Sequence, residues 1–516
     1  MAHWEPGWPD VHRGRVSVNM STVDVRSAEG LFDTRYLQKA GSPQGGVLVP
    51  ICARGDAYTS GPSNGTIVTG LMTLKYTPEI SGQGLYMDFW NFGSSGSSAL
   101  GWGESIATLS TMTLQCGAFA STTFVRATVN GMQQATMDPG GKLLFYIPGF
   151  DVRAGTVINV QYGWSVPTSG VFPRWNARLY SSAIDSIDNT KGPSNVGTAT
   201  ATGGSGTTYG PSAVLTVPTA KSYCVGIFGD SIGAGLHDDA TTFNQIGYSG
   251  PGHLARGLTA AGIPQRQISL PSESMTYQVF PGLCKRMECL TGVTHVILQL
   301  GTNDFGLTLT VAQVQALAIA EATRLTNLGI RVGWATLTPR ADQSASPTAW
   351  AQTNAQVAGN QVVSTYAGLI STYNAWLRTI PAPGTFLVDA QVLLQESAAS
   401  PNTWGNGGQV LSGTVTSGST TTAVSTSLTG TSGAYEDMTI QWTLLHGAAP
   451  ITADGWRYIT GHSGGSGTAT FAATSVAAQV GDTFNLWKGW TVDGLHPNTW
   501  GSIQAQTAIS AGLFTS

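Results

Sequence analysis

Short alternating or apolar runs dominate the first part of the chain. Between residues 46 and 191, segments such as 66–75, 84–92 and 142–147 alternate hydrophobic with polar positions or are continuously apolar, and Gly, Pro, Asn and Ser interrupt them at short intervals. This pattern is typical of antiparallel strands joined by tight turns. It predicts an N-terminal all-β sandwich of jelly-roll type over 46–191.

Two flanking segments lack this periodicity. Residues 1–45 form no regular pattern and are interpreted as an N-terminal arm. Residues 192–212 are rich in Gly, Ser and Thr, a composition typical of a flexible linker.

After the linker the pattern changes to strands that alternate with helices. An amphipathic period marks a helix over 311–327, ended by Gly329, and a second helix is predicted over 362–380. Repeated β-α-β order indicates a parallel sheet with helices on both faces, a three-layer α/β domain. Its predicted strands cover residues 223–228, 265–270, 294–300, 330–336 and 385–389.

The α/β pattern stops near residue 405 and resumes near 483. The intervening segment 405–482 is again Gly/Ser/Thr-rich, with a period-two stretch at 437–444 and a hairpin predicted around 463–467. We therefore expect an α/β domain made of 213–404 and 483–516, interrupted by a β-rich insertion. Such an insertion could form a rim or lid over a site.

Composition narrows the class of protein. Only 10% of the 516 residues are charged, 66 are Gly and 15 are Trp, which favours a β-rich extracellular or virion-type protein. A net charge of −4 without a basic cluster argues against a nucleic-acid partner. The five cysteines form neither a metal-ligand spacing nor an even disulfide set, so we expect buried free thiols and no metal or other cofactor.

Export and membrane signals are not found in the sequence. No apolar stretch approaches the roughly 18–20 residues of a membrane span, and the N-terminus shows no secretory signal. An extracellular composition without such a signal favours release by cell lysis as part of a phage particle; trimming of the sequence is the alternative.

A serine directly after a buried strand is the first candidate for chemistry. The apolar run Tyr223–Phe228 leads into Gly229-Asp230-Ser231-Ile232, where small residues allow a sharp turn. Residues 229–233 also match the Gly-x-Ser-x-Gly elbow of α/β-hydrolases. That fold needs several strands before the serine, whereas this strand opens the α/β segment, so the elbow interpretation is disfavoured.

Two further motifs complete a set. Gly301-Thr-Asn-Asp304 follows a strand, and Asp493-Gly-Leu-His-Pro497 comes near the end. Loops at the carboxyl ends of parallel strands share one edge of the sheet, where ligands bind. In order and spacing the three motifs resemble the SGNH (GDSL-type) hydrolases, a family of esterases and acylhydrolases, over roughly 221–404 and 483–516.

The resemblance implies a role for each matched residue. Ser231 would be the nucleophile, His496 its general base, and Asp493 the residue that orients the imidazole. The oxyanion hole would combine the Ser231 N–H, the Asn303 amide and a third backbone N–H. In the family that third donor belongs to a glycine; here the matching position is Ser272, which serves only if its backbone conformation permits.

Each candidate also has a structural interpretation. Ser231 could cap a helix, Asn303 could form a plain turn, and His496 could be an exposed loop histidine. Asp230 is expected to be a scaffold hydrogen-bonding residue, and His295, which enters a strand, a structural one.

The substrate is less constrained than the reaction. Trp404, Trp487, Trp490 and Trp500 lie near the histidine motif or the insertion and could stack on sugar rings or belong to the core. The order of domains resembles phage tail or prophage-encoded esterases, which implies an acetylesterase acting on an O-acetylated bacterial surface polysaccharide. Two alternatives remain: a lipase- or thioesterase-like acylhydrolase, and a virion adhesion protein whose SGNH domain only binds. A homo-oligomer or virion attachment is compatible with each.

Overall fold

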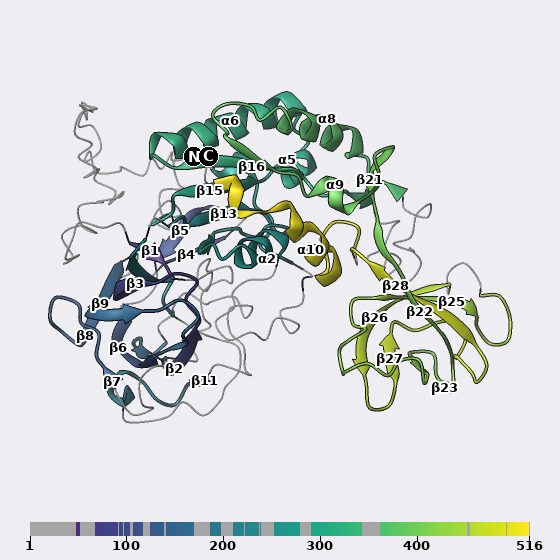
Figure 1. The fold of residues 1–516 in the computed structure, drawn as a ribbon, viewed down its shortest axis with the longest axis horizontal. Helices are drawn as coiled ribbons and strands as arrows, with labels where there is room; N and C mark the ends of the chain where they lie inside the picture. Colours follow the sequence, from purple (N-terminus) through teal and green to yellow (C-terminus); the bar gives the residue numbers. More distant parts are fainter. Residues whose placement is uncertain are drawn as a thin grey trace, which may run out of the picture.

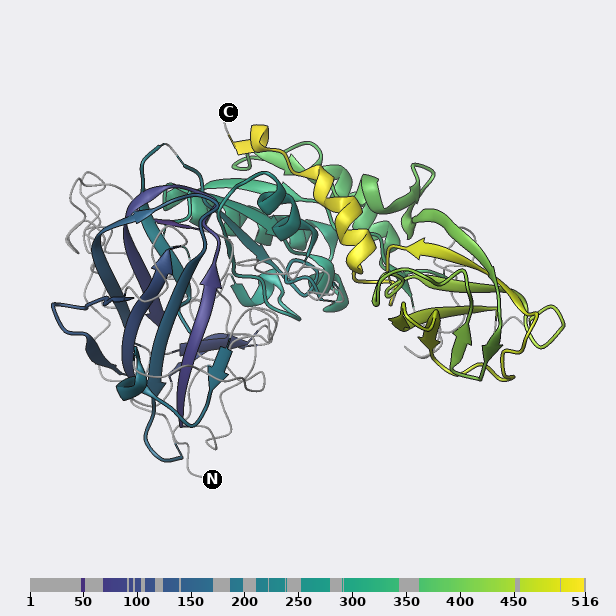
Figure 2. The same cartoon turned by 60° about the horizontal axis from the view of Figure 1, so that its bottom comes forward.

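The larger sheets of the described residues are two N-terminal antiparallel sheets, a central parallel sheet and a separate antiparallel sheet of seven strands (Figures 1 and 2). The computed structural model describes residues 48–51, 68–90, 92–95, 98–103, 107–116, 124–138, 141–169, 186–197, 210–220, 222–236, 238, 252–278, 290, 292–342, 362–450, 455–491 and 493–514. The expected arm 1–45 and most of the expected linker, 198–209, lie outside these residues.

Two antiparallel sheets form the N-terminal part. Phe89 of the first sheet meets Tyr162 of the second edge to face, with ring centroids 5.4 Å apart, so the sheets pack against each other. The jelly-roll topology expected for them stays a prediction. The first sheet has the order β1 (Val49–Pro50), β12 (Ala213–Pro218), β3 (Gly82–Trp90), β9 (Lys142–Val152); the second has the order β11 (Ser186–Asp188), β2 (Thr69–Tyr76), β10 (Ile158–Ser165), β6 (Ala107–Cys116), β7 (Phe124–Val125), with β8 (Gln134–Met137) also on β6, and a hairpin joins β4 (Phe92–Ser95) to β5 (Ser98–Gly103).

One strand lies in a different sheet from the one expected. β12 was assigned with the α/β segment that begins at 213, but it pairs antiparallel with β1 and β3. Its start, Ala-Val-Leu-Thr, is buried, as a strand inside a sheet requires. The chain thus returns to the first sheet before it enters the parallel one, and the linker joins two strands of the N-terminal part.

The central sheet is parallel throughout. Its order is β14 (Gln265–Gln267), β13 (Val225–Gly229), β15 (His295–Gln299), β16 (Arg331–Ala335), β19 (Phe386–Val388). The first strand in the chain, β13, is second in the sheet: the next strand, β14, lies on one side of it, and the later strands lie on the other. The topological switch point therefore lies between β13 and β15, where open α/β sheets bind ligands at the carboxyl ends of their strands.

Helices cover both faces of this sheet. On one face Val225 and Ile227 pack with α2 (His253–Ala260) and the C-terminal segment. On the other, Phe228 and Leu298 pack with α6 (Val311–Asn327) and α8 (Ala367–Leu377). Further elements are α3 (Met275–Gln278), α5 (Thr302–Gly306), α9 (Gln391–Leu394), α10 (Thr499–Ala505), the short 3-10 helices η2 (Pro193–Asn195), η6 (Gln506–Ala508) and η7 (Ala511–Phe514), and the pair β17 (Ala341–Asp342) and β18 (Val362–Val363).

Helix boundaries were predicted unequally well. α6 has the predicted bounds, because Thr310 and Gln313 form a capping box at its start and a glycine follows its end. The helix expected over 362–380 is wrong at its start. Val362 and Val363 pair with β17 instead, and Ser364 forms a turn before α8 begins at Ala367.

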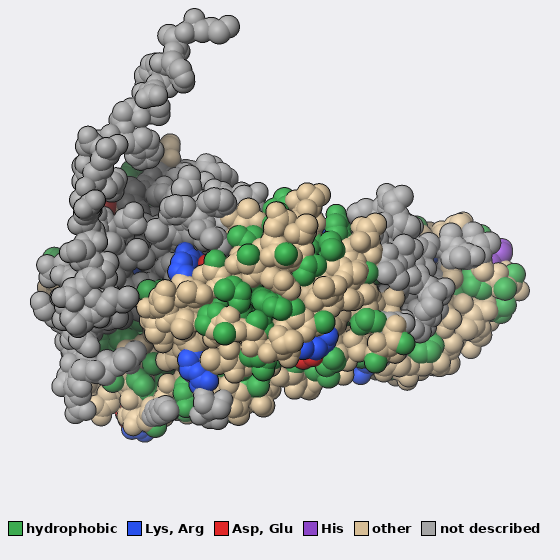
Figure 3. Space-filling view, turned by 90° about the horizontal axis from the view of Figure 1, so that it is seen from above, with side chains coloured by type: hydrophobic (Ala, Val, Ile, Leu, Met, Phe, Trp, Pro, Cys, Tyr) green, Lys and Arg blue, Asp and Glu red, His purple; other side chains and the backbone are tan. Residues whose placement is uncertain are grey.

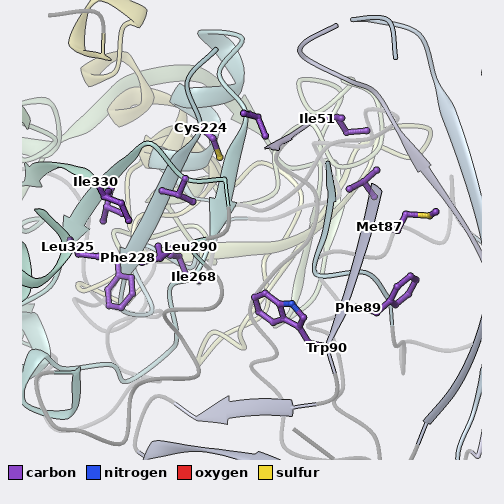
Figure 4. Packing of buried hydrophobic residues seen from close by; sticks show 14 of the residues in the cluster. Ile51, Met87, Phe89, Trp90, Cys224, Phe228, Ile268, Leu290, Leu325 and Ile330 are labelled. Carbon is purple, nitrogen blue, oxygen red and sulfur yellow. The ribbon is translucent and has the colours of Figure 1, made fainter. Parts of the chain in front are cut away.

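One hydrophobic core runs from the N-terminal sheets into the parallel domain (Figure 4). Arg266 of β14 is fully buried in this region, 5.2 Å from the centroid of the Trp90 ring of β3, and donates to Ser212 Oγ at 3.3 Å. Trp90 in turn donates to the buried Asp88 carboxylate at 2.9 Å. The N-terminal sheets and the parallel domain are therefore joined by packed, desolvated contacts.

The insertion forms its own sheet and core (Figures 1 and 2). Its first and last strands pair with each other, and Asn406 of the first lies opposite Gly489 of the last. The sheet includes residues 483–489, which were expected in the α/β domain, so the insertion is longer than predicted. Its antiparallel order is β22 (Asn406–Thr414), β28 (Thr483–Gly489), β25 (Thr439–Leu444), β26 (Trp456–Ser463), β27 (Thr468–Phe471), β24 (Thr422–Val424), β23 (Ser417–Gly418); a hairpin of β20 (Gln395–Ser397) and β21 (Ser400–Trp404) precedes it.

The surface carries few charges. On the face seen in Figure 3, Lys, Arg, Asp and Glu side chains are sparse among uncharged ones. Within the described residues, none of the helices has the length and apolar character needed to cross a bilayer.

The buried Arg266 gives a test of the shared core. Arg266→Ala should lower the free energy of unfolding by about 3 kcal/mol, because it removes a desolvated cation–π contact and a hydrogen bond that the charged guanidinium donates to Ser212. Chemical denaturation measures this change. Arg153→Ala, which removes an exposed ion pair with Asp151, should change the same quantity by less than about 0.5 kcal/mol. Equal effects in the two variants would contradict the shared core.

Candidate active site

The turn after β13 presents Ser231 at the switch point. Its tight path depends on glycine, because a Cβ on Gly229 would lie 2.9 Å from Gln299 Oε1 and one on Gly233 would lie 2.8 Å from Ser269 Oγ. After Ser231 the chain makes a helical turn, in which Leu236 N–H donates to the Ser231 carbonyl at 2.9 Å. The Ser231 side chain is half-buried and remains accessible.

Asp230 stabilises this turn from inside. It is fully buried, and its Oδ1 accepts the Ile232 N–H at 2.8 Å. Burial, with a smaller contribution from the nearby Asp304 carboxyl, raises the pKa of Asp230 to about 7. The expectation of a scaffold role for Asp230 agrees with this position.

His496 lies between Ser231 and Asp493. Its Nε2 is 2.8 Å from Ser231 Oγ, and its Nδ1 is 2.6 Å from Asp493 Oδ2. The other carboxylate oxygen of Asp493 accepts the backbone N–H groups of Leu495 and His496 at 2.9 and 2.8 Å. With Asp493 accepting the Nδ1–H, Nε2 keeps the lone pair that can accept the serine proton.

Neighbouring segments hold the Asp493–His496 turn in place. Gly494 has a φ of +77°, which favours glycine. Its carbonyl accepts the Trp404 indole N–H and the Ala341 N–H, both at 2.9 Å, and its own N–H donates to Thr491 Oγ1 at 3.0 Å. The carboxylate and the imidazole therefore sit on a turn that is bonded on both sides.

The loops after β14 and β15 approach the same turn. Leu270 N–H donates to the Gly229 carbonyl at 3.0 Å, so the loop after β14 runs beside the end of β13. Asn303 Nδ2 donates to the Glu273 carbonyl at 2.8 Å and ties the two loops together. An amide nitrogen carries two hydrogens, so this bond leaves one for another acceptor.

Ser272 has a backbone conformation that is typical of glycine. Its φ is +64°, in the left-handed region that few residues other than glycine adopt. It lies next to Glu273, to which Asn303 is bonded. Among the described residues, the backbone N–H groups of Ser231 and Ser272 form no hydrogen bond.

Asp304 holds the loop after β14 in place through hydrogen bonds. Its carboxylate accepts the Met275 N–H at 3.1 Å and both the N–H and the hydroxyl of Thr276 at 3.2 and 3.1 Å. Burial raises the pKa of Asp304. The motif Gly301–Asp304 thus supplies one candidate donor, Asn303, and one structural carboxylate.

The tryptophans have different positions. Trp404, expected as a possible sugar-stacking residue, is fully buried, so a substrate cannot reach its face. Trp487, Trp490 and Trp500 are half-buried; Trp487 donates to Gln441 Oε1 at 2.9 Å, and the Lys488 ammonium covers the Trp500 ring at 4.4 Å.

Further contacts support the loops around the candidate site. Arg340 donates to the Thr302 carbonyl at 3.3 Å and lies over the Tyr366 ring at 4.6 Å, beside the Asn303 loop. Thr491 and Trp404 hold the histidine turn through backbone groups, which no residue pattern reveals. His295 is buried at the start of β15 with its Nδ1 2.8 Å from Thr294 Oγ1, a structural position as expected.

The described residues contain no group of three or more His, Cys, Asp or Glu side chains placed to hold a metal ion. Cys224, at the start of β13, is a buried free thiol.

Asp230 gives a pH-dependent prediction. An acid whose pKa is raised by folding stabilises the protein fully below the pKa of the unfolded chain, about 4, and this contribution is lost as the pH rises to about 7. The stability of the wild type relative to Asp230→Asn should therefore fall between pH 4 and 7 and stay constant above. Urea denaturation of both proteins across this range checks the trend; a difference independent of pH would contradict it.

Comparisons with known proteins give only distant likenesses. No protein-family profile and no curated protein sequence matches the chain. Among solved structures, it is similar to a GDSL-like lipase from Bacteroides thetaiotaomicron (12% identity, 36% of this chain and 80% of that one, TM-score 0.25). It is also similar to a carbohydrate esterase family 2 enzyme with a carbohydrate-binding domain from Corynascus thermopiles (14% identity, 66% and 89%, TM-score 0.24). A third is a family two carbohydrate esterase from Cellvibrio japonicus (9% identity, 66% and 85%, TM-score 0.25). At these identities and TM-scores, the likenesses assign the chain to no family.

Proposed function

We propose that the protein is a serine ester hydrolase with Ser231 as its nucleophile. The observation that carries this proposal is the continuous hydrogen-bonded path from Ser231 Oγ through His496 to the Asp493 carboxylate, at 2.8 and 2.6 Å. A serine hydroxyl is a weak nucleophile unless a positioned base takes its proton, and this path supplies both the base and the group that orients it.

The reaction would proceed in two displacements. Ser231 Oγ attacks the ester carbonyl carbon while His496 Nε2 takes the hydroxyl proton, and the carbonyl electron pair moves onto its oxygen. When the tetrahedral intermediate collapses, the alcohol leaves with the proton from His496 and an acyl-Ser231 remains. A water molecule, deprotonated by His496, then attacks the acyl carbon; as the second tetrahedral intermediate collapses, His496 returns the proton to Ser231 Oγ, and the carboxylic acid and the free serine are released.

The developing oxyanion would be bound by three donors. The N–H groups of Ser231 and Ser272 form no other hydrogen bond among the described residues, and the Asn303 amide has one hydrogen to spare. Fixed donors of this kind contribute strongly, since removing one costs about 10²–10³ in rate.

The substrate proposal is an acetyl ester on a bacterial surface polysaccharide, met outside the cell or on a virion. It is supported by the low-charge, Gly- and Trp-rich composition, by three half-buried tryptophans near the histidine motif in the sequence, and by a surface with few charges. A partly exposed aromatic ring can stack on the apolar face of a sugar ring.

Ser231→Ala tests the reaction and the substrate together. The wild type should hydrolyse p-nitrophenyl acetate and release acetate from O-acetylated polysaccharide, and the variant should lose at least about 10³-fold in kcat because the nucleophile is gone. Acetate release and p-nitrophenol absorbance measure the two activities. Ser466→Ala, at an exposed serine of the insertion, is the matched control and should retain full activity.

Other outcomes separate the alternatives. A preference for p-nitrophenyl palmitate over the acetate would favour a lipase-like acylhydrolase. No Ser231-dependent hydrolysis of any ester would contradict the proposed function and favour a binding-only protein.

Ser272 gives a second test, because its proposed donor belongs to the backbone. Ser272→Gly should keep kcat within about twofold and leave or raise stability, since glycine adopts a φ of +64° without strain. Ser272→Val should lower both, because a β-branched residue is strained in that region. Steady-state kinetics and thermal unfolding measure the pair. A large loss of kcat in Ser272→Gly would assign the role to the serine hydroxyl instead.

A further inference from the structure

A short segment of the insertion contacts the residues that directly follow the catalytic turn. Glu436 and Asp437 lie just before β25, and both bond to the start of α10. That helix begins at Thr499, three residues after His496. The contact therefore lies close to the residue that would move the proton.

Asn498 is the centre of this contact. It caps α10, with its Oδ1 accepting the Gly501 N–H at 2.9 Å. Its Nδ2 donates to the Asp437 carbonyl at 3.0 Å and to the Gly489 carbonyl at 2.9 Å, and its backbone N–H donates to Trp490 at 3.0 Å. The Asn498 side chain is fully buried, and its bonds to Gly489 and Gly501 are shielded from water, whereas the bond to Asp437 is partly buried.

Asp437 adds a charged acceptor to the same end of the helix. Its Oδ2 accepts the buried Thr499 hydroxyl at 2.8 Å. A carboxylate beside the first turn of a helix also interacts favourably with the helix dipole. Asp437 has a φ of +64° and donates its own N–H to the Ile459 carbonyl of β26 at 3.2 Å, so the sheet of the insertion fixes its position.

We propose that Asp437 is a positioning residue for His496. It acts through Thr499 and Asn498, which hold the start of α10 and so set where the preceding turn, and the imidazole on it, can lie. A misplacement of a catalytic group by about 1 Å can lower the rate about 10²-fold. The bond between Asp437 and Thr499, three residues from His496, can therefore affect kcat. This inference rests on the proposed function of His496 as the base.

The test removes the carboxylate without straining the backbone. Asp437→Gly tolerates a positive φ, and it should lower kcat by about tenfold while KM changes by less than about twofold. Asp437→Asn also tolerates this φ and keeps an oxygen acceptor for Thr499, so it should restore most of kcat. Thr499→Val, which removes the donor, should reproduce the loss, and the double variant Asp437→Gly/Thr499→Val should lose no more than either alone.

Thr460→Val is the matched control. Thr460 donates to the Thr470 carbonyl at 3.2 Å within the same insertion, far in sequence from α10. Its substitution should leave kcat unchanged. Wild-type kcat in Asp437→Gly, no rescue by Asp437→Asn, or an equal loss in Thr460→Val would overturn the proposal.

A spectroscopic measurement separates this inference from the proposed function. In protein labelled with ¹³C-histidine, the His496 ring signal can be assigned by its loss in His496→Gln. That signal should shift and broaden in Asp437→Gly and stay unchanged in Thr460→Val. If the His496 signal shifts in Asp437→Gly but the wild type hydrolyses no ester, the positioning role is supported and only the enzymatic role is contradicted. An unchanged His496 signal in Asp437→Gly would overturn the positioning role whatever the activity.

Discussion

The hydrogen bond between Ser231 and His496 is the constraint on which the candidate site depends. It joins residues 265 positions apart, from a turn after the second strand of the parallel sheet to a turn near the end of the chain. Such a contact exists only if the sheet order, the return of the chain after the insertion and the glycine-dependent turn at Gly229 are all correct. Because long-range contacts carry a large loop-closure cost, the surrounding packing must stabilise this one.

That packing comes from several directions. Trp404 and Ala341 bind one side of the histidine turn through the Gly494 carbonyl, and Asn498 fixes the other side. Two buried carboxyl groups, Asp230 and Asp304, organise the serine turn and the loop after β14, and burial raises the pKa of each. The site therefore combines a few reactive side chains with a larger number of buried polar groups that only hold backbone, as expected where geometry limits catalysis.

The sequence predicted elements better than their partners. The α6 bounds were predictable because a capping box and a glycine mark both ends, and the parallel strands because buried runs alternate with helices. The sheets to which β12 and β28 belong were not predictable, since the alternation of hydrophobic and polar residues identifies a strand but not the sheet that it joins. Likewise Ser231, Asn303, Asp493 and His496 stand in recognisable motifs, whereas Trp404 acts through a backbone carbonyl and leaves no residue pattern. The sequence did not predict the left-handed backbone of Ser272; it indicated only that Ser272 needs a suitable backbone conformation to serve as a donor.

The pairing of Asn406 with Gly489 has an evolutionary consequence. Because the two ends of the insertion lie side by side, the whole sheet could be gained, lost or exchanged during descent without opening the α/β domain. Such modularity would be incomplete, however, because α10 takes its capping partners from the inserted sheet. A different inserted domain would preserve the geometry of the histidine turn only if it placed oxygen acceptors at the same positions. Selection on activity would therefore act on a short segment of the insertion, while the rest of its sequence could vary.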